Sequence, residues 1–186
     1  MTEYTNESAN ASAANSTNAA GVSLTALRDG STAAYGAYSI DRNEWSLGFD
    51  FTGAKNIGKL RYYSLAYNDR AKNGVVEYWN GSTWVKIPVT SVADNASLYN
   101  TDEVQFSNAN GWNTVIFTPV LATKFRVRWT VSWQIGDNNS TISEIEMYSV
   151  AGWSHVSKAG GISQLNISKF LGVTKNNIAK IGGTAV

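Results

Sequence analysis

The chain of 186 residues contains no cysteine and a single histidine, His155. The absence of cysteine excludes disulfide bonds, thiolate chemistry and cysteine-ligated zinc, whatever compartment the protein occupies. With one histidine, the chain can form neither a Cys/His catalytic pair nor a histidine-rich metal centre. It also has no nucleophile-elbow, zincin or phosphate-loop motif. These absences indicate a protein that is not an enzyme.

Charge is sparse as well, since charged residues make up 16% of the chain and the formal net charge is +1. The chain therefore lacks the concentrated positive field that drives binding to nucleic acid. No stretch approaches the roughly 20 consecutive apolar residues that cross a bilayer. The polar segment Met1–Glu7 has neither the charged nor the apolar region of an export signal. We expect no nucleic-acid partner, no membrane insertion and no export signal.

Aromatic residues, in contrast, reach 12% of the chain, and apolar residues alternate with polar ones in two segments. An alternation of period two is typical of strands with one buried face. The alternating residues are Leu47, Phe49, Phe51, Phe125, Val127 and Trp129. Further strands are predicted over residues 59–65, 115–118 and 142–148. The sequence thus predicts an all-β domain with one core.

Asn80-Gly81 separates two of the predicted strands, Val75–Trp79 and Ser82–Ile87. Both residue types tolerate positive φ, as a type I′ turn requires. The pattern predicts a β-hairpin with a two-residue turn.

Three regions follow from composition. Residues 8–21 are small and polar, so residues 1–23 are predicted to be an extended low-complexity arm that a partner orders. Residues 24–150 form the predicted sandwich. Residues 151–186 contain an eleven-residue repeat that occurs three times, at 155–161, 166–172 and 177–183.

Each repeat places a β-branched residue, a lysine and a glycine at fixed offsets, with too little apolar surface to fold alone. We expect the repeats to stack or to dock on a partner. The predicted assembly residues are Val156, Lys158, Ile167, Lys169, Ile178 and Lys180.

Residues 26–148 resemble the discoidin or factor 5/8 type C family, which also includes carbohydrate-binding modules. The resemblance rests on the order of several short motifs: Asp29-Gly30, Leu47–Phe51, Ile57–Tyr63, Val76–Tyr78 with Trp84, Phe117–Val120, Phe125–Val127 and Ser143–Tyr148. It implies a galactose-binding-like jelly-roll β-sandwich that binds sugars.

The resemblance also implies a calcium ion that rigidifies a loop, held by Asp29 and Glu144 with nearby backbone carbonyls. The loop at residues 31–35 departs from the family pattern, which usually has a threonine and a tryptophan there. The alternative is that Asp29 only caps a turn.

A sugar site needs an aromatic ring for the apolar face of a pyranose and planar polar groups for its hydroxyls. Residues of these types lie in the predicted loops, and the alternative for each aromatic residue is packing within the protein. The candidates are Tyr35, Tyr38, Arg42, Trp45, Arg70, Trp133 and Asn138.

The C-terminal repeats resemble short units of bacteriophage structural proteins. The leading hypothesis is a non-enzymatic virion protein, a capsid or tail decoration. Its arm and repeats would bind other virion proteins, it would form a homo-oligomer, and its sandwich would adhere weakly to host glycans.

The alternative is a dedicated carbohydrate-binding, receptor-binding module, stabilised by calcium. A glycosidase would need two carboxylates facing each other across a groove.

Overall fold

The computed structural model describes residues 3–33, 36–39, 44–65, 71–107, 109–132, 141–150, 158–159 and 162–163. The chain divides into two units, Tyr4–Ser149 and a second unit of Met1–Glu3 with Val150–Val186. The first unit is a β-sandwich. In the second, β13 (Lys158–Ala159) pairs antiparallel with β14 (Ile162–Ser163).

The sandwich consists of strands and two 3-10 turns. They are β1 (Tyr4–Asn6), η1 (Ser8–Asn10), β2 (Ala11–Thr17), β3 (Ala19–Ala20), η2 (Ala26–Arg28), β4 (Ala37–Ser39), β5 (Trp45–Ser64), β6 (Ala71–Trp79), β7 (Trp84–Lys86), β8 (Val89–Asp94), β9 (Ala96–Leu98), β10 (Val104–Phe106), β11 (Gly111–Ser132) and β12 (Thr141–Val150). Within the described ranges, no helix is long and apolar enough to span a membrane.

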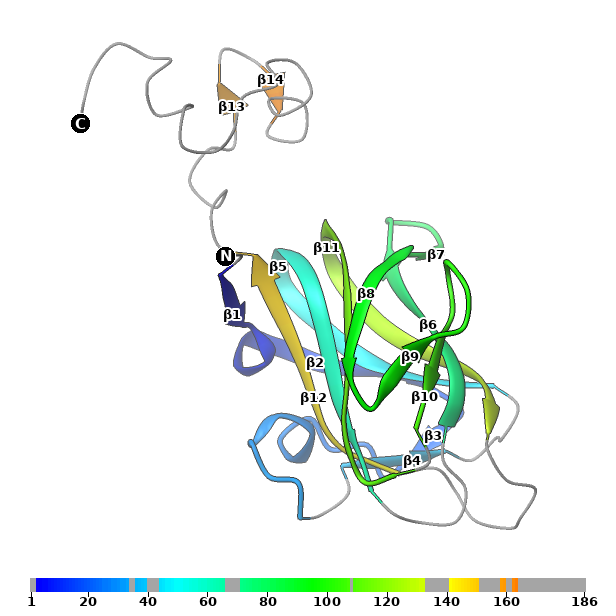
Figure 1. Ribbon diagram of the computed structural model, residues 1–186. Coiled ribbons are helices and arrows are strands. Elements are labelled where there is room, and N and C mark those ends of the chain that lie inside the picture. Colours follow the sequence, from blue (N-terminus) through cyan, green and yellow to red (C-terminus); the bar gives the residue numbers. More distant parts are fainter. Residues whose placement is uncertain are drawn as a thin grey trace. The chain divides into compact units, whose positions relative to one another are not determined.

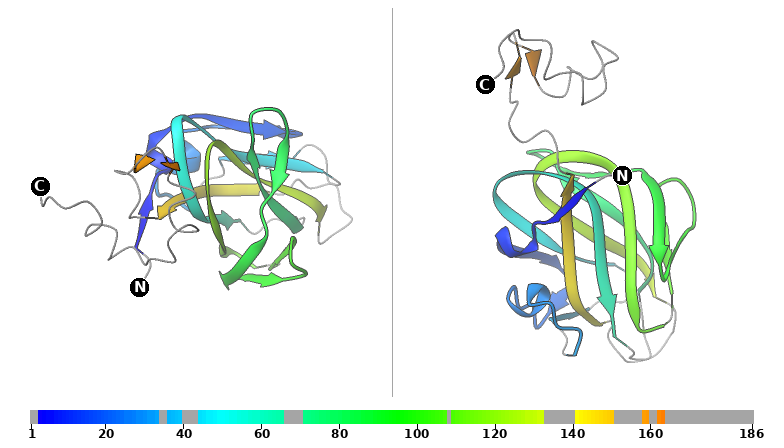
Figure 2. Two further views of the ribbon diagram at one scale, coloured as in Figure 1. Left: turned by 90° about the horizontal axis from the view of Figure 1, so that it is seen from above. Right: turned by 60° about the vertical axis from the view of Figure 1, so that its left-hand side comes forward.

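The two longest strands, β5 and β11, pair antiparallel along most of their length. The pairing extends from Trp45 opposite Trp129 to Ser64 opposite Gly111. The register shifts twice between residues 116 and 124 of β11, and such irregularities bend a strand pair. The bent pair runs through both layers of the sandwich, as Figure 1 and Figure 2 show.

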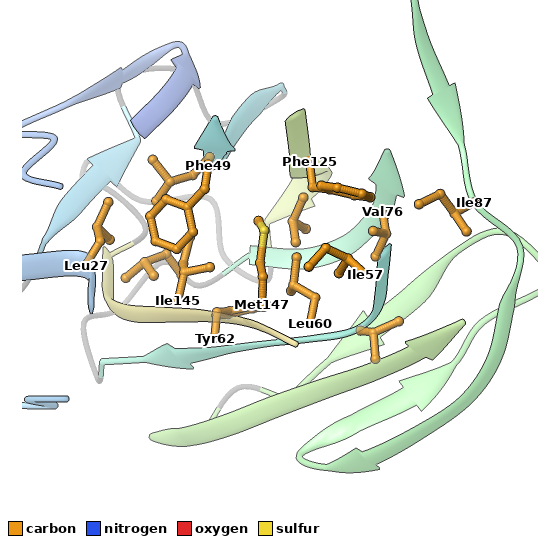
Figure 3. Packing of buried hydrophobic residues seen from close by; sticks show 14 of the residues in the cluster. Leu27, Phe49, Ile57, Leu60, Tyr62, Val76, Ile87, Phe125, Ile145 and Met147 are labelled. Carbon is orange, nitrogen blue, oxygen red and sulfur yellow. The ribbon is translucent and has the colours of Figure 1, made fainter. Parts of the chain in front are cut away.

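One layer adds β12, β4 and β1 beside β5, and β8 beside β11. The other layer adds β2 beside β5, and β6, β7, β10 and β9 beyond β11. Side chains from both layers meet in the core shown in Figure 3, with Leu60 and Met147 from the first layer and Phe49, Val76 and Phe125 from the second. All five are fully buried. The predicted alternation and the predicted all-β sandwich are confirmed.

The N-terminal residues form part of this sandwich. Strand β2 pairs with β5, from Ala11 opposite Phe51 to Thr17 opposite Ser46. Ala11 is buried, and Ala14 packs against the core. The prediction of an arm ordered by a partner is therefore wrong for residues 4–20. Backbone pairing with β5 orders a segment whose side chains bury little surface.

The hairpin of β6 and β7 also differs from its prediction. Trp79 pairs with Trp84, so the connection has four residues, 80–83, instead of two. Gly81 has a φ of 107°, whereas Asn80 is not in the positive-φ region that a type I′ turn requires. Instead, Asn80 Oδ1 accepts hydrogen bonds from the backbone N–H groups of Ser82 and Thr83, each at 2.9 Å.

Strands β5 and β11 approach most tightly at Gly48. A Cβ atom built on Gly48 would lie 1.9 Å from the carbonyl oxygen of Phe125. The same carbonyl accepts a hydrogen bond from Asn15 Nδ2 of β2 at 3.3 Å. The absence of a side chain at Gly48 therefore allows three strands to meet.

We predict that Gly48→Ala lowers the free energy of unfolding by about 1–3 kcal/mol or more, because a methyl group there displaces backbone atoms. Denaturant unfolding measures the change. Gly53→Ala is the matched control, since nothing lies within 4 Å of its added Cβ. We expect it to change stability by less than about 0.5 kcal/mol. Equal losses in both variants would contradict the prediction.

Candidate functional site

The segments predicted to contact sugar begin and end at one end of the sandwich, which we call the loop pole. Ser132, the last residue of β11, pairs with Ala71, the first residue of β6. Thr141, the first residue of β12, pairs with Tyr38 of β4. Strand β5 begins at Trp45 beside the same end of β11. In Figure 1, β4 and the first residues of β12 lie at the lower edge of the sandwich.

Most of the predicted sugar contacts lie outside the described residues. These are Tyr35, Arg42, Arg70, Trp133 and Asn138. Four of them belong to segments 40–43, 66–70 and 133–140, which connect strands that end at the loop pole. The tertiary structure thus brings the ends of these segments together, although they are far apart in the sequence.

Trp45 is not a sugar contact. Its side chain is 1% exposed, and its ring stacks on Trp129 with centroids 4.1 Å apart. Tyr62 packs edge-on against Trp129 at 5.3 Å. Trp45 shares the inward face of β5 with Leu47 and Phe49, because side chains two apart in a strand point the same way. The three rings form an aromatic core beneath the loop pole.

Tyr38 keeps partial exposure beside the loop pole. Its ring lies over Gly21, where a built Cβ would come within 2.7 Å of the ring. Gly21 has a φ of 62°, so a side chain there would be strained as well as crowded. Of the predicted sugar contacts that the structure describes, Tyr38 is the one with accessible surface.

The two predicted calcium ligands, Asp29 and Glu144, lie together beside β12. Asp29 follows η2, and Ser31 donates its backbone N–H to Asp29 Oδ1 at 2.7 Å. Gly30 donates its backbone N–H to Glu144 Oε2 at 3.2 Å. Glu144 is 1% exposed although it is on the outer face of β12, because the loop that begins at Asp29 covers it.

The carboxyl group of Glu144 holds its proton unusually well. Burial, together with the neighbouring carboxyl groups of Asp29 and Glu146, raises its pKa to about 7, against the opposing effect of the Gly30 N–H. A proton on Glu144 relieves both the burial of charge and the repulsion from these neighbours.

We predict that the protein loses stability as pH rises from about 4.5 to about 7. In this window the folded chain keeps a proton on Glu144 that the unfolded chain has released, so the free energy of unfolding falls with pH. The loss should be on the order of 1–3 kcal/mol. Urea unfolding at pH 5 and pH 7.5, with a chelator present, measures it.

Glu144→Gln is the control, since its side chain carries no charge at either pH. We expect the variant to lose less stability than the wild type between the two pH values. An identical loss in both proteins would show that Glu144 is not the group responsible.

A calcium ion would act on the same carboxyl groups. Calcium takes about six to eight oxygen ligands. Within the described residues, no group of three or more acidic or histidine side chains lies close enough to hold a metal. Asp29 and Glu144 would therefore supply only some of the oxygen ligands, and backbone carbonyls or water would have to supply the rest.

If calcium binds at this pair, 5 mM calcium should raise the melting temperature of the wild type at pH 7.5 by about 5 °C or more. Asp29→Asn should remove most of the rise, because it removes one of the two anionic ligands. Differential scanning fluorimetry, with magnesium as the control ion, tests this. If calcium leaves the melting temperature unchanged, the site is ruled out.

Sequence reasoning missed a cluster on the outer surface of the β12, β5 and β11 layer. We call it the aromatic–cationic face, and it comprises Tyr4, Lys59, Arg61, Tyr63, Trp112 and Tyr148. The spacing of residues 59, 61 and 63 indicates a shared face. Their partners on other strands could not be found without the register.

The predicted assembly residues are largely outside the described chain. Lys158 lies in β13, opposite Ser163 of β14. The structure does not describe Val156, Ile167, Lys169, Ile178 and Lys180. Docking of the repeats on virion proteins and homo-oligomer formation stay predictions.

No model of a protein family matches this chain, and no curated protein does either. The fold, however, is similar to solved carbohydrate-binding modules. One is chitosan-binding module 1 of a chitosanase/glucanase from Paenibacillus sp. IK-5, with a TM-score of 0.55 and 16% identity over 78% of this chain and 99% of the module. Another is the family 32 module of NanJ from C. perfringens, solved with galactose, with a TM-score of 0.59 and 13% identity over 79% of this chain and 100% of the module.

A third similar structure contains the CBM32-1 and CBM32-2 domains of ZmpB from Clostridium perfringens. Its TM-score is 0.59 at 14% identity, over 79% of this chain and 36% of that one. At such identities the similarity establishes the fold, a galactose-binding-like jelly-roll β-sandwich. It lends no support to the predicted virion role.

Proposed function

We propose that this chain is a non-catalytic carbohydrate-binding module that binds a glycan at the loop pole. The similarity to solved sugar-binding modules supports the class of function. The convergence of strand ends at one pole supports the location. This proposal corresponds to the alternative hypothesis from the sequence more closely than to the virion hypothesis.

The single observation that carries the proposal is the register of the strands that end at the pole. Ala71 lies opposite Ser132, and Tyr38 lies opposite Thr141. These pairs join the segments that contain Arg42, Arg70, Trp133 and Asn138. The described strand ends that flank these segments therefore lie at one end of the sandwich, and aromatic, guanidinium and amide groups suit a pyranose and its hydroxyls.

The first and last strands of the sandwich, β1 and β12, support the accessibility of the loop pole. Strand β12 runs from Thr141 at the loop pole to Val150 at the opposite end. Strand β1 pairs with β12, and Tyr4 lies beside Lys59, whose strand partner is Tyr148. Figure 1 shows that β1 begins and β12 ends on the side away from β4. The loop pole is consequently at the opposite end of the sandwich from the start of β1 and the end of β12.

The acidic residues support binding without hydrolysis. Glu44 is paired with Arg128 and Glu146 with Arg61, while Glu144 is buried under the loop after Asp29. Among the described residues that could supply a glycosidase, these three carboxylates are therefore engaged within the protein. A glycosidase needs a carboxylate pair held open to the substrate.

A glycan array with the full chain, followed by calorimetry on the best ligand, tests the proposal. We expect Arg70→Ala and Trp133→Ala each to weaken binding by about tenfold or more, because each removes a polar or stacking contact of roughly 1–3 kcal/mol. Thermal unfolding of each variant checks that the sandwich remains folded.

Tyr99→Ala is the matched control. Tyr99 is 59% exposed and lies between β9 and β10, away from the loop pole. Its loss should leave affinity unchanged. The proposal fails if no glycan binds, or if the loop variants and the control bind equally well.

A further inference from the structure

Among the described residues, Lys59 differs from Lys55 and Lys124 in forming no ion pair with an acidic residue. Lys55 pairs with Glu7 at 2.8 Å, and Lys124 pairs with Asp50 at 2.6 Å. The Lys59 ammonium group instead lies 3.6 Å from the ring centroid of Tyr148 and 4.8 Å from that of Tyr4. In the part of the chain that the structure describes, no ion pair or hydrogen bond of Lys59 is formed.

The acidic groups near Lys59 are already engaged. Glu146 is 8% exposed, and it accepts hydrogen bonds from Arg61 and from the Tyr148 hydroxyl group. Asp94, on the edge strand β8, accepts a hydrogen bond from Thr114. The charge of Lys59 is therefore not neutralised by a direct neighbour. Burial, and next the charge of Arg61, lower the pKa of Lys59, although the charges of Glu146 and Asp94 raise it.

Aromatic rings surround these two cations. The guanidinium group of Arg61 lies 4.0 Å from the centroid of Trp112, and Tyr63 contacts Trp112 edge-on at 5.5 Å. The register places Tyr148 opposite Lys59, and Tyr63 opposite Trp112, on adjacent strands. The aromatic–cationic face is thus continuous across β12, β5 and β11.

Beyond this face, the neighbouring strand β8 carries small side chains. Ser91 lies opposite Ile116 and Ala93 opposite Thr114, and both residues of β8 are exposed. Large rings on three strands therefore lie next to small, exposed side chains on a fourth.

We propose that the aromatic–cationic face is a second binding site, for a glycan that carries carboxylate or sulfate groups. The Lys59 ammonium group offers three N–H donors to the anionic oxygens. The rings of Tyr148 and Trp112 offer apolar surface to the sugar rings. This inference rests on the proposed function for the class of ligand, but it concerns residues that are separate from the loop pole.

The test compares three probes on the full chain by calorimetry: a neutral galacto-oligosaccharide, an oligogalacturonate and a sulfated galacto-oligosaccharide. We expect one or both acidic probes to bind, with the two acidic arms separating carboxylate from sulfate. Lys59→Gln should weaken this binding by about tenfold, since it removes a charge-assisted contact.

Lys124→Gln is the matched control, because Lys124 is a surface lysine on the other layer with Asp50 as its partner. It should bind the acidic probes like the wild type. Tyr148→Leu keeps an apolar residue but removes the ring, and it should weaken binding as well. Equal affinity of the wild type and Lys59→Gln, or equal losses in Lys59→Gln and Lys124→Gln, would overturn the second site.

The loop variant Trp133→Ala separates this inference from the proposed function. If it loses the neutral probe but keeps the acidic probes, the chain has two sites. If neutral probes bind and Lys59→Gln changes nothing, the second site alone is wrong. If acidic probes bind through Lys59 and no binding depends on Trp133, the loop-pole proposal is wrong. If no probe binds, the second site is wrong, and the glycan array decides the loop-pole proposal.

Discussion

The pairing of β5 with β11 is the interaction on which the sandwich depends. These strands lie at the centre of both layers, and β2, β6, β8 and β12 each pair with one of them. Their pairing needs close backbone contact at Gly48, where the Phe125 carbonyl occupies the space of a side chain. It also needs a bend between residues 116 and 124, where the register shifts and Pro119 is exposed. Because proline donates no backbone hydrogen bond, it suits an irregular point in a strand.

The bend has consequences at both ends of the molecule. It brings Trp45 and Trp129 of one layer against Tyr62 of the other, so a buried aromatic core supports the loop pole. It also turns the second half of β5 so that Lys59, Arg61 and Tyr63 face outward beside β12. One folded strand pair therefore positions both candidate binding surfaces, one at the end of the sandwich and one on its side.

Charged side chains on the outer faces are mostly arranged in local networks. Glu77 is 4% exposed and forms ion pairs with both Arg126 and Arg128. The Arg126 guanidinium group also lies 4.1 Å from the ring centroid of Trp84. Such a network satisfies a buried carboxylate and covers an aromatic ring. Lys59 differs from these cations because its ammonium group lies over the rings of Tyr148 and Tyr4 and, among the described residues, forms no ion pair.

The sequence by itself determined the positions of β5, β6, β7, β11 and β12, the inward faces of β5 and β11, and the resemblance to sugar-binding sandwiches. Those features depend on local alternation and on motif order, which a single chain displays. It misassigned residues 4–20, because small side chains carry no signal of the backbone pairing that orders them. It also misassigned Trp45, whose position next to a predicted loop resembled that of an exposed aromatic residue.

Only the tertiary structure decided which distant residues meet. Asp29 and Glu144 lie 115 positions apart in the sequence, yet a hydrogen bond from the Gly30 backbone N–H to the Glu144 carboxyl group joins the loop after Asp29 to β12. Lys59 and Tyr148 become neighbours solely through the register of β5 and β12. The physical reason is that strand register is set by hydrogen bonds and packing between segments far apart in the chain, and no local pattern specifies the partner of a strand.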